Sequence, residues 1–483
     1  MVTALPVLHK TPGIKTVGGE DLAQTIPTVA GDFRPDPNGI PEDDMVHENK
    51  WYNQDFDGFR LVEQVLYTKR PIRLICVGAG AVGLTVAFKA ERELENVLVQ
   101  IYEKNHDVGG TWLENRYPGC MCDIPSHSYQ FTWARNSRWT SFYSKAEEIW
   151  QYFKDTAVKY GLEKYIKFEH KVECATWNEE NGVWDLEIRT PDGSLIRDSC
   201  EVLVNGTGIL NSWSLPNIPG VHDYEGKLMH SAHWDQSFDL TDKTVAVIGG
   251  GSSAVQVIPN IQPIVKKLIP FLRSPVWVTT GFGAQYAGPN GTNFSYSEEQ
   301  KKKFETDPEG FDQYVRGLEG ELNKRFTLMH NHSKDQKISR DYVAEQMRKS
   351  LSNEELAARM VPNFGLGCRR MTPGEGYLQS LSKPNVHVVH DSVVRFTKTG
   401  VIDAAGTEHH VDAVVCATGF ADLFKPHFKV VGRGGKIVQD EFGDQPIAYM
   451  SIMAEHFPNM FREYPSLPLK VTVSKIRLTC GII

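Results

Sequence analysis

The stretch that decides the fold is Arg73-Leu-Ile-Cys-Val77, followed directly by Gly78-Ala-Gly80-Ala-Val-Gly83. The first five residues predict a buried strand, and residues 84–92 continue with helical spacing. Glycines at these positions permit a tight strand-to-helix turn and let the backbone approach a pyrophosphate, which the helix N-terminus stabilises. The stretch therefore predicts a dinucleotide-binding βαβ unit, and the alternative is a tight turn without a ligand.

A carboxylate follows the next predicted strand. Residues 97–102 have the pattern of a strand, and Glu103 stands 20 residues after Gly83. A carboxylate at this offset accepts hydrogen bonds from both hydroxyls of a ribose. Gly78, Gly80, Gly83 and Glu103 together are therefore predicted to bind a dinucleotide.

A second fingerprint, Gly249-Gly-Gly251-Ser-Ser-Ala254, follows a predicted strand over residues 244–248. Arg273 stands 19 residues after Ala254, where the first unit has an acid. A guanidinium there pairs with a 2′-phosphate and favours NADPH over NADH, and the alternative is a solvated surface arginine. Opposite charges at the two ribose positions predict FAD at the first fingerprint and NADPH at the second. The residues predicted to hold NADPH are Gly249, Gly251, Ser252, Ser253, Ala254, Arg273 and Ser274.

The rest of the chain extends this α/β pattern. Residues 171–189 alternate around a Glu-Glu-Asn-Gly turn and predict a β-hairpin, and residues 386–389 and 412–416 predict further strands. Helical spacing at residues 298–304 and 341–351 predicts a helical insertion over about 285–360. Pro270 cannot donate to a strand ladder, so we expect it at the start of its strand.

Composition excludes several classes of protein. The 483 residues carry 52 basic and 60 acidic side chains, a net charge of −8, which argues against nucleic acid as a partner. Eight dispersed cysteines do not form a secreted disulfide framework, and we predict no metal site. No apolar run approaches the length of a membrane span, and the N-terminus lacks a signal pattern. We therefore expect a cytoplasmic protein.

Between the two fingerprints lies a longer motif. Tyr224-Glu-Gly-Lys-Leu-Met-His230-Ser-Ala-His-Trp234-Asp235 resembles the F-x-G-x-x-x-H-x-x-x-W-[P/D] signature of Baeyer–Villiger monooxygenases, with Tyr224 for Phe. The resemblance covers roughly residues 65–460. It implies that this segment joins the two nucleotide domains, and we expect packing rather than proton transfer from His230.

The resemblance extends to two further motifs. Gly109-Gly-Thr-Trp112 and Asn115-Arg-Tyr-Pro-Gly-Cys-Met-Cys-Asp123 resemble the flavin loop of that family. The resemblance implies that the flavin is lined by Thr111, Trp112, Asp123 and Tyr129, that Val172 meets the FAD adenine, and that Met121 and Cys122 approach the nicotinamide.

Cys368-Arg369-Arg370 resembles the family's C-[KR]-R motif. The resemblance places Arg370 over the flavin and Arg369 near the NADP phosphate. Arg370, oriented by Asp123, is the predicted catalytic group, because an arginine is always charged and offers a planar fork of donors for negative charge on oxygen. The reaction implied uses O₂ to insert an oxygen atom beside a ketone carbonyl.

The chain as a whole resembles fungal secondary-metabolism members of the family, similar to the monooxygenases of sterigmatocystin and aflatoxin pathways. The fold expected is α/β with two Rossmann-like domains. The boundaries are an N-terminal extension at 1–70, an FAD domain at 71–221 and 393–461, an NADPH domain at 222–392, and an atypical tail at 462–483.

Two alternatives stay open at this point. One is a flavin monooxygenase that oxygenates nitrogen or sulfur and shares both nucleotide folds. The other is an inactive nucleotide-binding remnant, because the family continues differently after Phe461. The substrate ketone and the oligomeric state are not specified by any motif.

Overall fold

The computed structural model describes residues 69–324, 326–351, 353–420, 425–443, 446–450 and 452–462. From Lys69 onward the chain forms one unit. The predicted N-terminal extension, 1–70, lies outside the described residues except for its last two positions. The predicted tail, 462–483, lies outside them except for Arg462, which is buried and closes the last strand.

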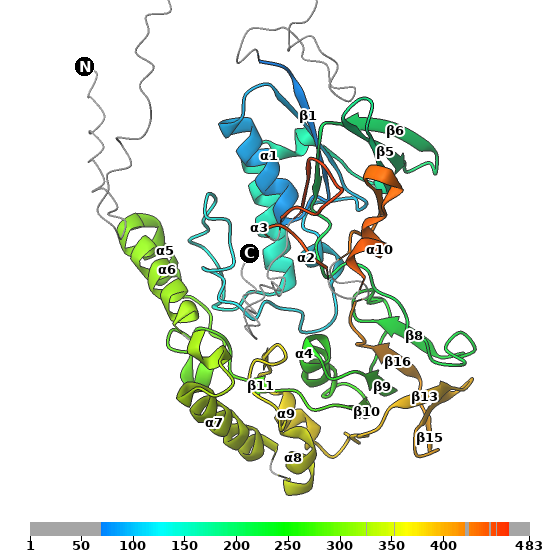
Figure 1. The fold of residues 1–483 in the computed structure, drawn as a ribbon. Helices are drawn as coiled ribbons and strands as arrows, with labels where there is room; N and C mark the ends of the chain where they lie inside the picture. The colour runs from blue at the N-terminus through cyan, green and yellow to red at the C-terminus, as the bar shows by residue number, and fades with distance from the viewer. Residues whose placement is uncertain are drawn as a thin grey trace, which may run out of the picture. The chain divides into compact units, whose positions relative to one another are not determined.

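The first fingerprint lies in a parallel sheet with the strand order β18-β7-β1-β2-β3. Its strand β1 lies beside helix α1 in Figure 1. The central strand β1 (Ile72–Val77) leads into helix α1 (Ala81–Glu93), which buries Leu84 and Ala87, and β2 follows. The predicted strand, helix and strand are therefore confirmed. The other elements of this layer are β2 (Val97–Tyr102), α2 (Thr111–Glu114), α3 (Ala146–Lys159), the 3-10 helix Leu162–Tyr165, β3 (Ile166–Lys167), β7 (Val202–Asn205) and β18 (Met460–Arg462).

A second sheet, with the order β17-β4-β5-β6, contains the predicted hairpin. β4 (Lys171–Asn178) and β5 (Val183–Arg189) pair antiparallel up to Asn178 and Val183, so the predicted turn is confirmed. Trp184 of β5 is fully buried and donates its indole N–H to the Pro458 carbonyl at 2.8 Å, which ties the hairpin to the C-terminal strand. The sheet is completed by β6 (Leu195–Cys200) and β17 (Lys429–Val431), with α10 (Val438–Phe442) alongside.

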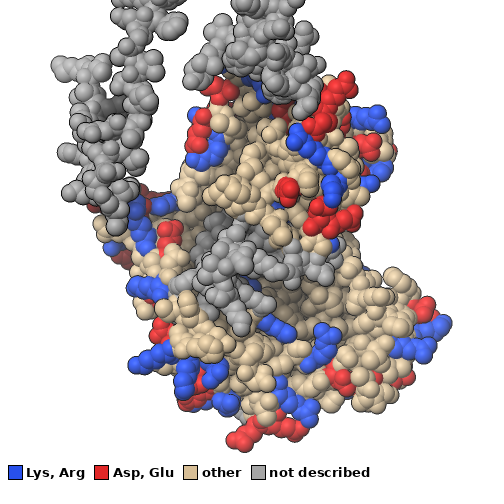
Figure 2. Space-filling view, in the orientation of Figure 1, with Lys and Arg blue, Asp and Glu red and all other residues tan. Residues whose placement is uncertain are grey.

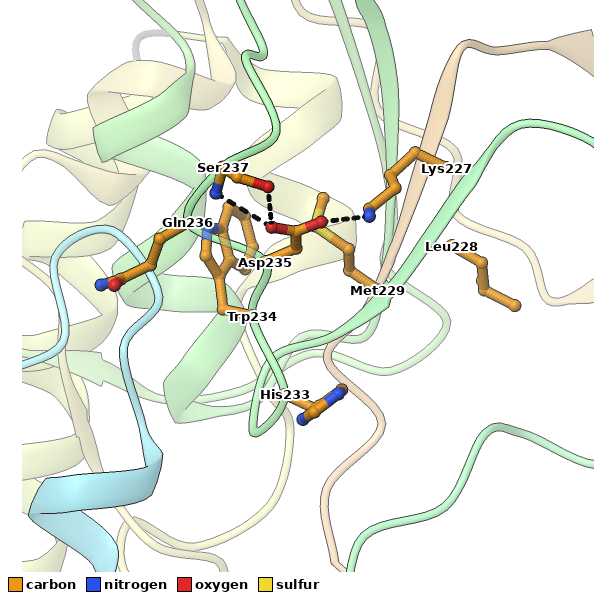
Figure 3. A pocket seen from close by; sticks show the side chains of 8 residues that line it. All are labelled: Lys227, Leu228, Met229, His233, Trp234, Asp235, Gln236 and Ser237. Atoms are coloured by element: carbon orange, nitrogen blue, oxygen red, sulfur yellow. Dashed lines mark hydrogen bonds and ion pairs between the residues drawn. The ribbon is translucent and has the colours of Figure 1, made fainter. Parts of the chain in front are cut away.

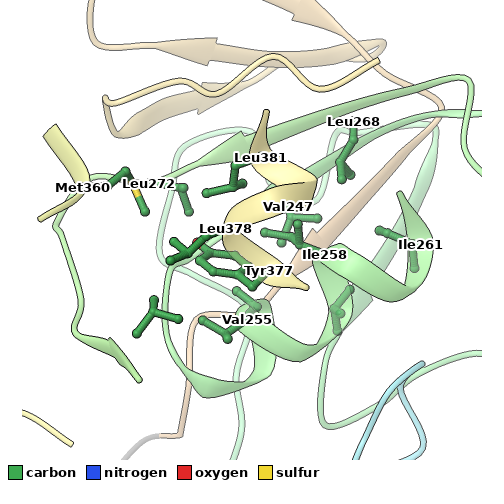
Figure 4. Packing of buried hydrophobic residues seen from close by; sticks show 14 of the residues in the cluster. Val247, Val255, Ile258, Ile261, Leu268, Leu272, Met360, Tyr377, Leu378 and Leu381 are labelled. Atoms are coloured by element: carbon green, nitrogen blue, oxygen red, sulfur yellow. The ribbon is translucent and has the colours of Figure 1, made fainter. Parts of the chain in front are cut away.

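The second fingerprint lies in a parallel sheet with the order β10-β9-β16-β8. β9 (Thr244–Ile248) leads into α4 (Ser252–Ile261), again as predicted. Val255, Ile258 and Ile261 of α4 pack with Tyr377 and Leu378 of α9 (Tyr377–Leu381) in one buried cluster (Figure 4). The remaining strands of this sheet are β8 (Lys227–His230), β10 (Lys267–Phe271) and β16 (Ala413–Cys416).

The predicted return to the first domain at residue 393 is wrong. β16 pairs with β8 and β9, and the antiparallel strands β13 (Val393–Phe396), β14 (Gly400–Asp403) and β15 (Glu408–His410) precede it. Phe396 and Val401 are buried with Ala246 of β9 and Ile269 of β10. The chain rejoins the first domain only after Cys416, because β17 and β18 pair with strands of that domain.

Pro270 also differs from its predicted position, since it is the fourth of the five residues of β10. Leu268 and Leu272 donate to the carbonyls of Asn385 and Val389, but Pro270, midway between them, has no N–H to donate. The missing bond interrupts this ladder. The predicted strand over residues 386–389 is consequently reduced to two isolated bridges beside β10.

The predicted helical insertion is confirmed by four helices: α5 (Glu298–Thr306), α6 (Pro308–Asn323), α7 (Lys334–Leu351) and α8 (Glu354–Met360). Two of them begin at Ser297 and Asp307, whose side chains accept hydrogen bonds from the first helical turn. The short elements of this region are the 3-10 helices Pro289–Gly291 and Phe326–Met329 and the strand pair β11 (Val278–Thr279) and β12 (Thr372–Pro373), and a 3-10 helix Arg433–Gly435 follows β17.

Basic and acidic side chains are interspersed over the face shown in Figure 2. Among the described residues, no helix has the length and apolar character that crossing a membrane requires. The same residues contain no group of three or more potential metal ligands.

Candidate functional site: two nucleotide folds and an Asp–Arg pair

The first glycine loop has no room for side chains at two of its three glycines. Gly78 has a φ of +107°, and a Cβ there would lie 2.5 Å from the Gly206 carbonyl oxygen. A Cβ on Gly83 would lie 2.2 Å from the Gly78 carbonyl oxygen. Gly80 caps α1 without a side-chain hydrogen bond, so the first-turn N–H groups are not taken by a cap. The loop fits a diphosphate.

Glu103 is buried, and both carboxylate oxygens accept backbone hydrogen bonds. Oε2 accepts from the Ala79 N–H at 2.7 Å and Oε1 from the Asn105 N–H at 2.8 Å. Burial raises the pKa of Glu103, and the two backbone bonds oppose this shift. The structure thus brings Glu103 to the fingerprint loop, and each oxygen keeps a second lone pair for a ribose hydroxyl.

The second glycine loop repeats this geometry. Gly249 has a φ of +125°, and a Cβ there would lie 2.3 Å from the Ala417 carbonyl oxygen. A Cβ on Gly251 would meet no atom within 4 Å, and Gly251 caps α4 without a side-chain bond. Ala254 is fully buried, while Ser252 and Ser253 occupy the first turn of α4. This loop also fits a diphosphate.

Arg273 and Ser274 follow β10, the strand next to β9. A Cβ built on Gly250 would lie 3.7 Å from the Ser274 carbonyl oxygen, so the structure brings this segment to the second fingerprint. Arg273 is exposed and forms no hydrogen bond or ion pair with another described residue. Its charge is therefore available to an anionic ligand.

The predicted flavin residues lie on and near the short helix α2. Thr111 opens the helix, and Trp112 is buried and donates its indole N–H to the Tyr129 hydroxyl at 3.0 Å. Val172 is buried in β4, two residues after His170, whose N–H bonds the Glu103 carbonyl. The structure thus places Val172 near the predicted ribose position.

Asp123 and Arg370, 247 positions apart in the sequence, form an ion pair. Nη2 of Arg370 donates to both carboxylate oxygens of Asp123 at 2.8 Å. The Asp123 side chain is 15% exposed and that of Arg370 is 60% exposed. Desolvation lowers the pKa of Arg370, but Asp123 outweighs it and holds that pKa above its usual value. Arg369 instead lies over the Phe364 ring, with its guanidinium carbon 5.4 Å from the ring centre.

Met121 and Cys122 belong to the loop that carries Asp123. The Met121 carbonyl accepts a hydrogen bond from Gln256 of α4 at 3.0 Å, and Cys122 is buried with its N–H on the Ser144 carbonyl. Burial raises the pKa of the Cys122 thiol, so it stays protonated. Sequence reasoning missed Gln256, although it stands only two residues after the second fingerprint.

The signature segment is a packed element. His230 is buried, its Nδ1 accepts the Ala232 N–H at 3.1 Å, and burial lowers its pKa. Trp213 stacks on both His230 and His233, with ring centres 5.1 Å apart in each pair. These contacts fit a packing role for His230.

A hollow of about 560 Å³ lies along this segment, lined by residues 227–229 and 233–237 (Figure 3). The Asp235 carboxylate pairs with Lys227 and also accepts hydrogen bonds from the backbone N–H and the hydroxyl of Ser237. Neither Asp123 nor Arg370 lines this hollow, so it is separate from the Asp–Arg pair.

Two dinucleotide folds in one chain, together with the Asp123–Arg370 pair, define a nucleotide-dependent oxidoreductase of the two-domain flavoprotein class. Family models agree with this class. The NAD(P)-binding Rossmann-like domain matches residues 76–146, and the L-lysine 6-monooxygenase/L-ornithine 5-monooxygenase model matches residues 135–281.

Relatives of known sequence narrow the class of oxidoreductase to monooxygenases. The FAD-binding monooxygenase tazF of Aspergillus terreus is 42% identical over 82% of this chain and 71% of its own length. The FAD-binding monooxygenase moxY of Dothistroma septosporum is 37% identical over 81% of this chain, which spans only 63% of that relative. A Baeyer–Villiger monooxygenase of Pseudomonas aeruginosa is 30% identical over 81% of this chain and 72% of its own.

The fold of this chain is similar to that of a solved structure. Cyclohexanone monooxygenase from Rhodococcus sp. Phi1, bound to NADP⁺, matches with a TM-score of 0.69 and 25% identity, covering 81% of this chain and 80% of that one. The chain therefore belongs to the FAD-binding monooxygenase family that includes the Baeyer–Villiger monooxygenases. The resemblance inferred from its motifs is confirmed.

Proposed function

We propose that this protein is an FAD- and NADPH-dependent monooxygenase that inserts one oxygen atom of O₂ next to a ketone carbonyl, giving an ester or lactone. The observation that carries the proposal is the Arg370–Asp123 pair, in a chain with two glycine loops that each fit a diphosphate. Bound FAD and NADPH supply hydride transfer and the activation of O₂.

The chain's own residues bind, orient and stabilise charge. Asp123 accepts both of its hydrogen bonds from Nη2 of Arg370. Nη1 and Nε of Arg370 bond none of the described residues. These donors can face negative charge that develops on oxygen as the carbonyl is attacked, a stabilisation worth about 3–4 kcal/mol per donor. Asp123 fixes the direction in which the donors point.

A test of the proposal uses the full chain and a panel of ketones, amines and sulfides with NADPH and isotopically labelled O₂. An ester or lactone carrying one labelled oxygen supports the proposal. A labelled N-hydroxyl or sulfoxide product, with no ester, favours the second candidate, a nitrogen- or sulfur-oxygenating enzyme. The match of residues 135–281 to the lysine and ornithine monooxygenase model is the observation behind that candidate.

The remnant alternative has its own test. Purified protein that retains flavin absorbs near ~450 nm, a property of the cofactor itself. A protein that binds flavin and oxidises no NADPH, with or without ketone, is a nucleotide-binding remnant. The resemblance of the sequence to fungal secondary-metabolism members of the family is the reason to include polycyclic aromatic ketones of polyketide type in the panel.

We predict that Arg273→Ala removes most of the preference for NADPH over NADH. Arg273 stands exposed beside the second fingerprint, where a 2′-phosphate would bind it. A charged hydrogen bond contributes about 1.5–3 kcal/mol, so the ratio of kcat/KM values is expected to fall about 10- to 150-fold. Lys267→Ala, at the exposed start of β10, is the control and keeps the preference. Equal efficiency of the unmodified protein with both nucleotides contradicts the assignment.

We predict that Glu103→Ala lowers the flavin-to-protein ratio after gel filtration and leaves the affinity for NADP⁺ unchanged. The substitution removes the carboxylate proposed to hold the ribose. It also strips the Ala79 and Asn105 N–H groups of their acceptor, a cost of about 1–3 kcal/mol. Glu103→Gln keeps one acceptor oxygen and should retain more flavin than the alanine variant. A parental ratio in Glu103→Ala shows that the carboxylate serves only the loop.

A further inference from the structure

The loop that carries Asp123 is seated on helix α4, and one side chain of that helix holds it at two points. Gln256 donates from Nε2 to the Met121 carbonyl at 3.0 Å. Its Oε1 accepts from the Tyr117 hydroxyl at 2.9 Å. Three residues of the loop separate the two anchor points, so a single half-buried amide fixes both sides of the turn.

The loop also packs closely against α4 at its Gly119 turn. A Cβ on Gly119, whose φ is +80°, would lie 2.1 Å from Nδ2 of Asn260 and 2.9 Å from the Gln256 carbonyl. Asn260 Nδ2 in turn donates to that carbonyl at 2.7 Å. The Gly119 turn therefore packs directly against the Asn260 side chain and the Gln256 carbonyl of α4, with no room for a side chain of its own, so a shift of the helix moves the loop.

The contact between α4 and the loop joins the second glycine fingerprint to the Asp123–Arg370 pair. α4 begins at the second glycine fingerprint, one turn before Gln256. Asp123 stands two residues after Met121 and holds Arg370. Gln256 thus links the helix whose N-terminus would bind NADPH to the loop whose carboxylate orients the Arg370 guanidinium.

We propose that Gln256 is a positioning residue that locks the 117–123 loop onto α4 and so couples nucleotide binding at the second fingerprint to the Asp123–Arg370 pair. The coupling rests on the proposed function, while the lock itself does not. Glutamine suits the task because its amide both donates and accepts. A glutamate cannot donate to the Met121 carbonyl, and a methionine of similar size makes neither bond.

The first test is hydrogen–deuterium exchange of the full chain without nucleotide. Gln256→Met should exchange about tenfold faster at residues 115–123, because two hydrogen bonds are lost. The N–H groups of Cys120 and Cys122, bonded to the Tyr117 and Ser144 carbonyls, report this opening. Tyr117→Phe removes one of the two bonds of Gln256 and keeps the bond to the Met121 carbonyl, so it should give a smaller increase.

Gln262→Met is the matched control. Gln262 lies at the C-terminal end of the same helix and donates to Asn385 within the second domain. Its replacement should leave residues 115–123 at the parental rate. Parental exchange in both Gln256→Met and Tyr117→Phe overturns the proposal, and so does an equal increase in Gln262→Met. If Gln256→Met does not fold, Tyr117→Phe alone decides.

The second test adds NADP⁺. In the parent and in Gln262→Met, NADP⁺ should slow exchange at residues 115–123 as well as at 249–261. In Gln256→Met only 249–261 should respond, and flavin reduction by NADPH should slow while the flavin content stays parental. A response at both segments in Gln256→Met overturns the coupling. No response of 249–261 in the parent means that the proposed NADPH site is wrong, whatever the nucleotide-free exchange shows about the lock.

Discussion

Arg370→Ala is expected to abolish ester formation while the protein still folds and binds both nucleotides. Loss of one preorganised donor to a developing oxyanion costs about 100- to 1,000-fold in kcat. NADPH oxidation should persist in part and yield hydrogen peroxide in place of oxygenated product. The measurement is product and peroxide formed per NADPH consumed. The exposure of Arg370 makes a large loss of stability from this substitution unexpected.

The matched variants separate charge from geometry. Arg370→Lys keeps a positive charge but not a planar fork of donors, so it should recover little ester formation. Asp123→Asn keeps the size of the partner and removes its charge, so kcat should fall less than in Arg370→Ala. Arg395→Ala, at an exposed position of β13, is the control and should behave as the parent. Parental ester formation by Arg370→Ala would exclude the proposed role.

The elements around the two fingerprints could be predicted because local signals agree there. The strand ahead of each glycine loop is apolar, the glycines need a conformation or a closeness that other residues lack, and the helix follows at once. The hairpin over β4 and β5 was equally predictable from alternation and an Asn-Gly turn. Each of these inferences uses neighbours in sequence only.

The failures share a different cause, namely contacts between distant segments. Nothing local to Val393 indicates that β13 to β16 belong with β9, because that depends on which apolar face they bury. Pro270 is tolerated inside β10 because it costs this ladder one bond only, and its own carbonyl still accepts from the Val389 N–H. Gln256 is an ordinary helical residue in sequence, and its role becomes visible only when the loop 115–123 lies against it.

The candidate site also has features that the sequence predicts and features that depend on contacts between distant segments. Glu103 was expected to face a ribose, and its offset from the glycines predicted the right place in the fold. Its backbone bonds to Ala79 and Asn105 were not predictable, since they depend on how the loop after β2 turns. The Asp123–Arg370 pair rested on family resemblance, because two residues 247 positions apart share no local signal.

The glycines of the second fingerprint offer the last prediction, in which two similar substitutions should fail for different reasons. Gly249→Ala places a Cβ 2.3 Å from the Ala417 carbonyl oxygen at a φ of +125°. Left-handed backbone alone costs a side chain about 1–2 kcal/mol, and the clash adds to it. The melting temperature should therefore fall together with nucleotide binding, because the strand-to-helix turn is distorted.

Gly251→Ala should instead leave the melting temperature close to that of the parent and weaken NADP⁺ binding by at least about tenfold. Its φ is −82°, and a Cβ there meets no atom of the protein within 4 Å. The space that the Cβ would fill is the space through which a diphosphate approaches the backbone. Gly320→Ala, in the interior of α6 with equally open surroundings, controls for the change of residue type and should alter neither quantity for the worse. Differential scanning fluorimetry and titration with NADP⁺ measure the two effects separately. Parental NADP⁺ affinity in Gly251→Ala would mean that the nucleotide does not approach this turn, because a diphosphate seated on its backbone would meet the added methyl group.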